Sequence, residues 1–342
     1  MDKSVFEAVY RHFEQCNYYP FLKKVGDYRR GMRLSDWHFY EILAGYSELM
    51  YPDASLNFQV LFQWFMLRKS GIDARLFHTE DAVYLNAFSD EIEFGFYTIE
   101  QLGRRYVNLT ARRENLKLDD VEAYLTDFSP DEAHMPLSMH LRNLPHMTSA
   151  TTIERLIEFK HRGNDYKVRI RLNRDHLRMM DDYPYYNQSH YFDIQLSDEA
   201  ESTLLPQMEE LMEGRTLSEK VEFLLSFTRT AFFYRDDRRR YGREKPMTPE
   251  QTLYHSYSDC EDRSALFFYL CRKLLELPVI VLDFETHVGT AIELAGAQGD
   301  SYTHKGRKFV YCEPTGPMDE LKIGEMWEHV RKQKARILTD FI

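Results

Sequence analysis

The order of segments in the chain predicts an α+β fold in which helices followed by an antiparallel sheet occur twice. The first observation is the last part of the chain, where helical periodicity gives way to alternating strand patterns. The second is the first third, which shows the same order on a shorter scale. The third is a change of character between them, which predicts a β-rich middle module. The expected domains are therefore residues 1–127, 128–195 and 196–342.

The C-terminal domain is expected to hold helices, a long polar loop and a sheet. Helical patterns occur at 201–213, at 217–234 and from Cys260 onward, and the loop at 235–257 precedes the last of them. Strand patterns follow near 278–283, 287–294 and 307–312, and a final helix is expected near 319–335.

Three segments of the first third match segments of the C-terminal domain in the same order. The pairs are LSDWHFYEIL (34–43) with LSEKVEFLL (217–225), LFQWFMLRKSGIDARL (61–76) with LFFYLCRKLLELPVIVL (266–282), and GRRYVNLTA (103–111) with GRKFVYCEP (306–314). Aligned on their Arg-Lys pairs, the copies place Cys260 opposite Leu56, His287 opposite Asp81 and Glu313 opposite Thr110. Because the N-terminal copy lacks every reactive side chain, we expect it to be a degenerate copy kept for packing or binding.

The middle module contains one clear hairpin pattern. TTIERLIEFKHRGNDYKVRIRLNRD (151–175) is two alternating strands around an Arg-Gly-Asn-Asp turn. MPLSMHLRNL (135–144) and YYNQSHYFDIQLS (185–197) are expected to form further strands.

The composition is that of a soluble globular protein, and its charge excludes several classes of partner. The net charge is −11 and the pI is near 5.7, which argues against nucleic acid and against an anionic membrane surface. No apolar run approaches the roughly 18 residues that a membrane span needs. The start, MDKSVFEAVYRHFEQ, predicts an amphipathic helix and not a signal peptide, and the four cysteines show no paired spacing. We therefore expect a cytoplasmic protein, with a trimmed secreted chain as the alternative.

A cysteine stands among carboxylates at the start of the last long helical pattern, SDCEDRSALFFYLCRKL (258–274). Ser258 and Asp259 are suited to cap this helix, and acidic residues suit the positive end of its dipole. Cys260 would then lie at a helix N-terminus, where backbone N–H groups favour a thiolate and can hold an oxyanion. The alternative is a buried structural cysteine, which is the commoner role of a single Cys.

A cysteine nucleophile needs a histidine that accepts and returns its proton, and a third group that orients the imidazole. His287 begins the strand pattern HVGTAIEL, and Glu313 ends the next strand pattern before Pro314. Neighbouring antiparallel strands would place His287 beside Glu313, both facing the start of the Cys260 helix. Taken singly, His287 would be interpreted as an ordinary histidine and Glu313 as a solvated turn acid. The order and spacing of Cys260, His287 and Glu313 favour a triad instead.

Residues 249–315, with SDCED, HVGTAIEL and KFVYCEPT, resemble the bacterial transglutaminase-like superfamily of papain-fold cysteine enzymes. The pattern of that family is a Gly/Ser-Asp-Cys-Glu-Asp helix start, a His that opens a strand, and an Asp-Pro-Thr that closes the next. The resemblance covers residues 196–342. It implies a papain-like transglutaminase core in which Cys260 is the nucleophile, His287 the base and acid, and Glu313 the orienting carboxylate. Glu313 departs from the Asp that the family mostly has.

A second departure concerns the oxyanion hole. The Trp that protein-crosslinking transglutaminases use there is absent immediately before the Cys260 helix, because the three tryptophans lie elsewhere. Gln251, Tyr254 and Tyr257 are the candidates for a donor that would act with the Cys260 backbone N–H.

The acids around Cys260 have two interpretations. Glu261 and Asp262 can cap the helix or pair with Arg263, which is the simpler interpretation. Alternatively, Asp259 and Glu261 bind Ca²⁺ through carboxylate oxygens, as acids beside the Cys do in some bacterial transglutaminase-like proteinases. Calcium is the only cofactor that the sequence suggests.

The loop before the Cys260 helix is expected to form the rim of the substrate cleft. Four arginines in it could contact an acidic substrate or protein tail: Arg238, Arg239, Arg240 and Arg243. The alternative is a solvated loop whose arginines pair with its own acids, Asp236, Asp237 and Glu244.

The function that these patterns predict is thiol-dependent acyl transfer, most simply hydrolysis of a peptide or amide by a Cys-His-Glu triad. Transfer of the acyl group to an amine shares the first half-reaction and is one alternative. A non-catalytic protein-binding scaffold on the same fold is the other. The expected partner is a peptide or protein substrate.

Overall fold

The computed structural model describes residues 3–91, 93–101, 103–118, 121–126, 128, 130, 132–141, 143–146, 151–237, 245–316 and 321–342. It is a mixed α+β structure with two curled antiparallel sheets. The chain divides into two compact units. Unit 1 comprises Met1–Leu141 with Pro184–Asn187, and unit 2 comprises Arg142–Tyr183 with Gln188–Ile342.

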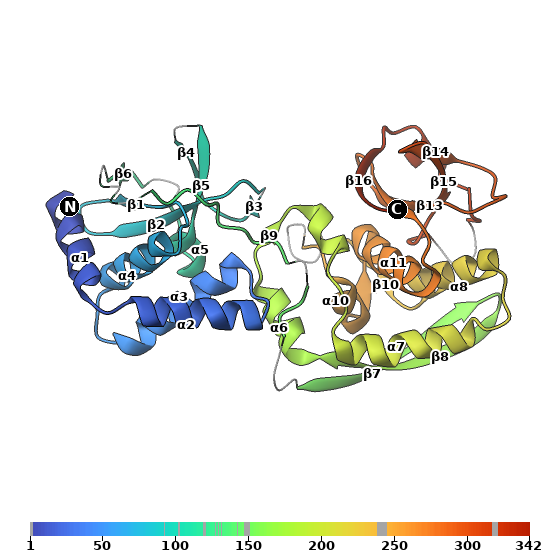
Figure 1. Ribbon diagram of the computed structural model, residues 1–342. Helices are drawn as coiled ribbons and strands as arrows, with labels where there is room; N and C mark the ends of the chain where they lie inside the picture. Colours follow the sequence, from blue (N-terminus) through green and yellow to red (C-terminus); the bar gives the residue numbers. More distant parts are fainter. Residues whose placement is uncertain are drawn as a thin grey trace. The chain divides into compact units, whose positions relative to one another are not determined.

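Unit 1 packs helices against a five-stranded sheet (Figure 1). Its helices are α1 (Lys3–Gln15), α2 (Tyr19–Gly31), α3 (Asp36–Met50), α4 (Leu56–Lys69) and α5 (Leu109–Arg113). The sheet has the order β4-β5-β2-β1-β6, formed by β1 (Ala74–His78), β2 (Val83–Phe88), β4 (Thr98–Gln101), β5 (Arg104–Asn108) and β6 (Tyr124–Leu125). A separate antiparallel pair joins β3 (Glu93–Phe94) to β9 (Tyr185–Tyr186).

Unit 2 has a second five-stranded sheet and a central helix. Its sheet has the order β14-β15-β13-β12-β16, formed by β12 (Val279–Asp283), β13 (Val288–Ile292), β14 (Ser301–His304), β15 (Arg307–Cys312) and β16 (Arg336–Phe341). The helices are α6 (Arg174–Asp182), η1 (a 3₁₀ helix, Gln188–Phe192), α7 (Asp198–Leu211), α8 (Leu217–Thr230), α10 (Pro249–Tyr254), α11 (Cys260–Leu275) and α12 (Glu328–Arg331). None of the helices in the described part of the chain has the length and apolar character that crossing a bilayer requires.

The central helix is α11, which begins at Cys260 as the sequence predicts. Every residue from Asp262 to Cys271 is buried, which is why its sequence is apolar on nearly all sides. It packs against α8 and against β12 and β13 of the sheet. The helix ends at Leu275, and the left-handed backbone of the next residue, Glu276 (φ 50°), stops the helical hydrogen bonding.

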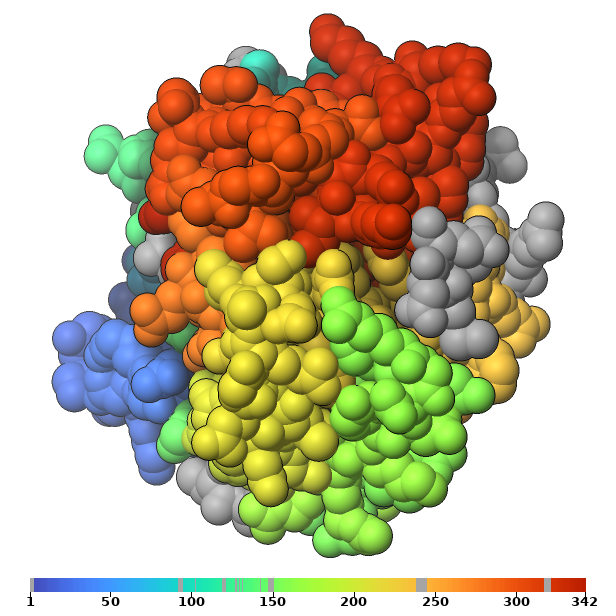
Figure 2. Space-filling model, turned by 90° about the vertical axis from the view of Figure 1, so that its right-hand side faces the viewer, coloured from blue at the N-terminus to red at the C-terminus, as the bar shows by residue number. Residues whose placement is uncertain are grey.

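The hairpin predicted in the middle of the chain is confirmed. β7 (Thr152–His161) pairs with β8 (Asn164–Asn173) through a tight turn in which Arg162 and Gly163 both have positive φ. Its apolar face belongs to the same core as α7 and α8, and Arg162 pairs with Glu222 of α8. Figure 2 shows the green hairpin beside the yellow α7–α8 segment. The segment expected as a middle module thus contributes its hairpin to the core of unit 2, whereas Tyr185–Tyr186 belongs to unit 1.

The two five-stranded sheets have the same strand order, and their elements coincide with the sequence repeat. β4, β5, β2, β1 and β6 of unit 1 correspond to β14, β15, β13, β12 and β16 of unit 2. The matched helical segments lie in α3 and α8 and in α4 and α11. In unit 2 the curl also brings the two edge strands into contact, since His304 Nε2 of β14 lies 2.5 Å from Asp340 Oδ2 of β16.

Several predicted elements are wrong. The helix expected near 319–335 is only α12, and the residues after it form β16; residues 317–320 lie outside the described part. Gly324 (φ 85°) explains this, because its backbone bonds to Tyr311 and Asp300 and leaves no room for a Cβ against Gln298.

Three other segments also differ from the expectation. The polar loop contains α10 and β11 (Tyr257–Ser258), and β10 (Phe233–Tyr234) lies just before it. YYNQSHYFDIQLS forms only β9 and η1. MPLSMHLRNL forms a single bridge, at Met135, within its described residues.

Candidate active site

Cys260 is the first residue of α11 and is half-buried. Its sulfur accepts a backbone hydrogen bond from Val288, the residue that follows His287, and its thiol donates to Glu261 Oε2 at 3.0 Å. Ser264 Oγ, one turn further along α11, donates to the Val288 carbonyl at 3.1 Å. The start of β13 is therefore fixed on the first turn of α11, which brings His287 to the end of the helix that carries the thiol.

His287 and Glu313 are in direct contact, as the strand geometry predicted. His287 Nε2 lies 2.8 Å from Glu313 Oε2, and the Glu313 side chain is fully buried. The contact forms because β13 and β15 are antiparallel neighbours, so that the residue before one lies near the residue after the other. An ionised carboxylate only accepts hydrogen bonds, so Nε2 carries the proton and Nδ1 is left as the basic nitrogen.

Glu313 is held ionised by three donors. Burial raises the pKa of this carboxyl, but hydrogen bonds from His287, the Tyr311 hydroxyl and the Thr315 backbone N–H outweigh it, and its pKa lies below the ordinary value. Tyr311 donates to Oε2 at 2.5 Å and Thr315 to Oε1 at 2.9 Å. Tyr311 can approach because residue 289 is glycine, where a Cβ would lie 2.5 Å from the Tyr311 hydroxyl oxygen. The Glu313 carboxylate is thus fixed in charge and in position.

Two aromatic rings lie beside the imidazole. The Phe284 ring stacks on His287 with 6.4 Å between centroids, and Trp327 meets it edge-on at 5.5 Å. Neither residue follows from the sequence pattern, because Phe284 lies in a turn and Trp327 is distant along the chain.

The three predicted oxyanion donors have their described contacts elsewhere. Gln251 caps α10 through its bonds with Thr248 and also donates to Asp181 at 3.1 Å. Tyr254 is exposed at the end of α10, and Tyr257 lies under the guanidinium of Arg235. The predicted rim residues Arg238, Arg239, Arg240 and Arg243 lie outside the described residues, as does Glu244.

A tyrosine that the sequence patterns did not single out, Tyr234, lies near the thiol. Burial, and then the proximity of Cys260 and Asp259, raise the pKa of the Tyr234 hydroxyl well above its ordinary value. Tyr234 lies on β10, which pairs with β11 just before α11, and Arg263 packs over its ring. The signal available in the sequence was the aromatic run Phe232-Phe233-Tyr234 in front of the polar loop.

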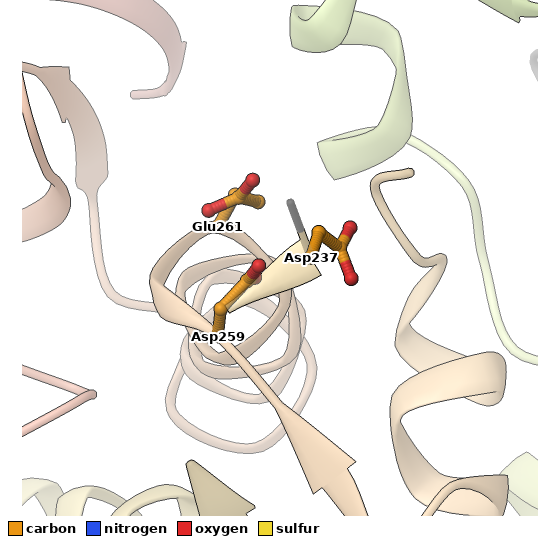
Figure 3. Close-up of side chains that lie close together, drawn as sticks. All are labelled: Asp237, Asp259 and Glu261. Atoms are coloured by element: carbon orange, nitrogen blue, oxygen red, sulfur yellow. The ribbon is translucent and has the colours of Figure 1, made fainter. Parts of the chain in front are cut away.

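The acids at the start of α11 form a cluster with Asp237, which the sequence reasoning placed only in the loop (Figure 3). One carboxylate oxygen from each of Asp237, Asp259 and Glu261 lies within 4.8 Å of the others. Asp259 is 4% exposed, and its Oδ1 has no hydrogen-bond partner. Asp262 beside them is buried and accepts from the backbone N–H groups of Met247 and Asp259.

This cluster fits a hard divalent cation. Three carboxylates converge there, and one of them has a buried oxygen without a partner, which is the donor set that Ca²⁺ prefers. Burial raises the pKa of Asp259 well above its ordinary range, and the neighbouring carboxyls of Asp262, Glu261 and Asp237 raise it further. Asp237, Asp259 and Glu261 are the residues that would hold the ion.

Replacing Asp259 by asparagine is expected to stabilise the metal-free protein at pH 7.5 by on the order of 1–2 kcal/mol. The folded-state pKa of Asp259 lies above the unfolded value of about 4, so the folded form retains a proton that the unfolded chain releases. The titration of Asp259 therefore costs no stability below about pH 4 and destabilises the folded state increasingly as the pH rises from there towards the folded-state pKa. Thermal unfolding of both forms between pH 4 and 8 measures this.

Asp165→Asn is the matched control, because its side chain is 74% exposed in the hairpin. The gain from Asp259→Asn should shrink towards pH 4, and millimolar CaCl₂ should stabilise the wild type more than the variant. A variant less stable than the wild type across this range without calcium would mean that the Asp259 carboxylate makes a net stabilising contact.

The corresponding positions of unit 1 carry no reactive groups. The strand pairing matches Val83 to Val288, so Ala82, and not Asp81 as the sequence alignment had it, corresponds to His287. Thr110 corresponds to Glu313 as expected, since each lies three residues after a paired valine. In unit 1 the amide oxygen of Asn57 takes the place of the Cys260 sulfur. It accepts a hydrogen bond from the Val83 N–H at 2.9 Å, as the sulfur does from the Val288 N–H.

Comparison of the chain with models of protein families, with curated proteins and with solved structures gives no match in any of the three. What the protein does is therefore inferred from the geometry of the site.

Proposed function

We propose that the protein is a thiol-dependent acyl-transfer enzyme, most simply a cysteine peptidase or amidase. The Cys260 sulfur attacks a carbonyl carbon while His287 Nδ1 takes the thiol proton. His287 then gives that proton to the leaving amine as the C–N bond breaks, and water hydrolyses the acyl-enzyme. Glu313 keeps the proton on Nε2 and stabilises the imidazolium. The observation that carries the proposal is the buried His287–Glu313 contact, one residue from the backbone group that bonds the Cys260 sulfur.

The start of α11 supports the same chemistry. The first N–H groups of a helix have no intrahelical partner, so the Cys260 N–H is available to an oxyanion formed beside it. The resting thiol, however, donates to Glu261, and burial together with Glu261 and Asp259 raises its pKa. A divalent cation at Asp237, Asp259 and Glu261 would offset the negative charge next to the sulfur.

The raised pKa of the thiol is also the observation that favours a second function. A thiol that stays protonated at neutral pH is a poor nucleophile. A protein with such a site would use the fold as a binding scaffold without catalysis. Acyl transfer to an amine instead of water requires the same first half-reaction and is tested by the same experiment.

The test is the rate of iodoacetamide labelling at each cysteine against pH, by mass spectrometry, with and without Ca²⁺. Cys16 is exposed and serves as the internal reference, whereas Cys271 and Cys312 are buried. In at least one of the two conditions we expect Cys260 to react below pH 8 faster than Cys16, and to lose roughly 10-fold or more of this rate in His287→Ala.

His304→Ala is the matched control, because His304 also contacts a carboxylate, Asp340, in the same unit. It should leave the labelling of Cys260 unchanged. If Cys260 follows an ordinary thiol titration near pH 8.5 under both conditions, and His287→Ala changes nothing, the enzyme proposal fails and the scaffold function replaces it.

A further inference from the structure

A cleft of about 640 Å³ opens beside His287 within unit 2. This volume lies within the range of small-molecule and side-chain pockets. Four aromatic residues contribute to its lining: Phe232, Phe233, Tyr234 and Trp327. His287 itself is part of the lining, so a side chain bound in the cleft would lie next to its imidazole.

The lining of the cleft includes two segments, residues 229–234 and residues 315–316 with Trp327, which are called its walls below. One buried guanidinium bonds to both. Arg263 of α11 donates to the carbonyls of Arg229 (3.2 Å) and Phe232 (2.8 Å) on one side. On the other side it donates to the carbonyl of Thr315 at 3.3 Å. Arg263 is only 2% exposed, so these bonds form away from bulk water. The cleft is therefore formed in advance of any ligand, which lowers the entropy lost on binding.

Two of the aromatic side chains in the lining are largely exposed. Phe233 is 76% exposed and Tyr234 58%, although both are held in β10 by pairing with β11. Gly316 also lines the cleft, where a Cβ would be in ordinary van der Waals contact with the Glu313 side chain and Trp327. Exposed aromatic side chains fixed around a cavity are typical of a binding site.

The charge of the lining selects among ligands. It includes the guanidinium groups of Arg229 and Arg263 and no Asp or Glu among its described residues. An ammonium or guanidinium bound there would have no direct carboxylate partner in the lining, whereas an uncharged ring meets aromatic faces. This charge pattern disfavours lysine and arginine side chains in the cleft.

We propose that this cleft receives a bulky aromatic side chain of a peptide, on the residue that carries the reacting carbonyl, and rejects lysine and arginine there. The position of the carbonyl rests on the proposed function, but binding of the ring does not. Phe233 and Trp327, which come from different segments of the lining, are the residues that would contact the ring.

The first test uses three peptidyl acyloxymethyl ketones that differ only in phenylalanine, glycine or lysine next to the electrophile. We expect the phenylalanine probe to modify Cys260 roughly 10–100-fold faster than either of the others. Phe233→Ala should reduce this preference by at least about 5-fold. Leu217→Ala is the control, because Leu217 is 43% exposed on α8 of the same unit and does not line the cleft.

A second measurement separates this inference from the proposed function. Saturation-transfer NMR of N-acetyl-phenylalaninamide with the Cys260→Ala variant should show the ring in contact, and adding Phe233→Ala should remove the signal; N-acetyl-lysinamide should give none. Equal probe rates with His287-dependent labelling would overturn the inference and keep the enzyme. Ring binding without any labelling would keep the inference and overturn the enzyme, and absence of both effects would overturn both.

Discussion

Replacing Glu313 by glutamine is expected to slow modification of Cys260 by the phenylalanine probe by roughly 10²–10⁴-fold while the fold is retained. Glutamine has the shape of glutamate but presents one donor and one acceptor. If its oxygen accepts from Thr315, its amide faces His287 and Tyr311, which are donors at Oε2 in the wild type. The imidazole can then avoid a donor–donor clash only by moving its proton to Nδ1, and it ceases to be a base towards the thiol. Second-order rates of Cys260 modification measure this effect.

Glu293→Gln is the matched control for this variant. Glu293 follows β13 and pairs with Arg307 away from the thiol, so its replacement should leave the rate unchanged. Circular dichroism establishes that both variants are folded. Equal rates in Glu313→Gln and in the wild type would mean that His287 does not depend on Glu313 for its tautomer.

Replacing Arg263 by methionine is expected to lower the free energy of unfolding of unit 2 by about 3–5 kcal/mol. Methionine replaces the side chain only as far as Nε and donates no hydrogen bond. The carbonyls of Arg229, Phe232 and Thr315 would then be left without this donor in a buried place. Urea denaturation followed by tryptophan fluorescence and circular dichroism measures the loss.

Two further variants keep this prediction testable. Arg336→Met removes an exposed ion pair with Asp283 and should not change stability measurably. Arg263→Lys keeps the charge but not the planar fork of donors, so it should lie between methionine and the wild type. If Arg263→Met were as stable as the wild type, the walls of the cleft would be held by other contacts.

The sequence predicts best what short-range rules control. The start of α11 at Cys260 follows from a cap and a helical period, and the β7–β8 hairpin follows from alternation around a glycine turn. The His287–Glu313 contact could also be predicted, because these residues flank consecutive strands and antiparallel pairing brings such positions together.

What the sequence could not predict depends on contacts between distant segments. The helix expected near 319–335 has suitable residues, but the backbone of Gly324 bonds to Tyr311 and Asp300 instead. The Arg263 side chain bonds to backbone groups that are 31 to 52 residues away along the chain. Trp327 reaches His287 in the same way. No periodicity or spacing encodes such contacts.

The contact between β14 and β16 has a consequence for the behaviour of the protein at high concentration. Edge strands present unpaired backbone groups that can pair with another chain and start aggregation. In unit 2, His304 and Lys305 at one edge both contact Asp340 at the other, which places charged side chains along both edges. This arrangement hinders the addition of a foreign strand to either edge. We therefore expect the sheet that carries His287 and Glu313 at its strand ends to resist self-association.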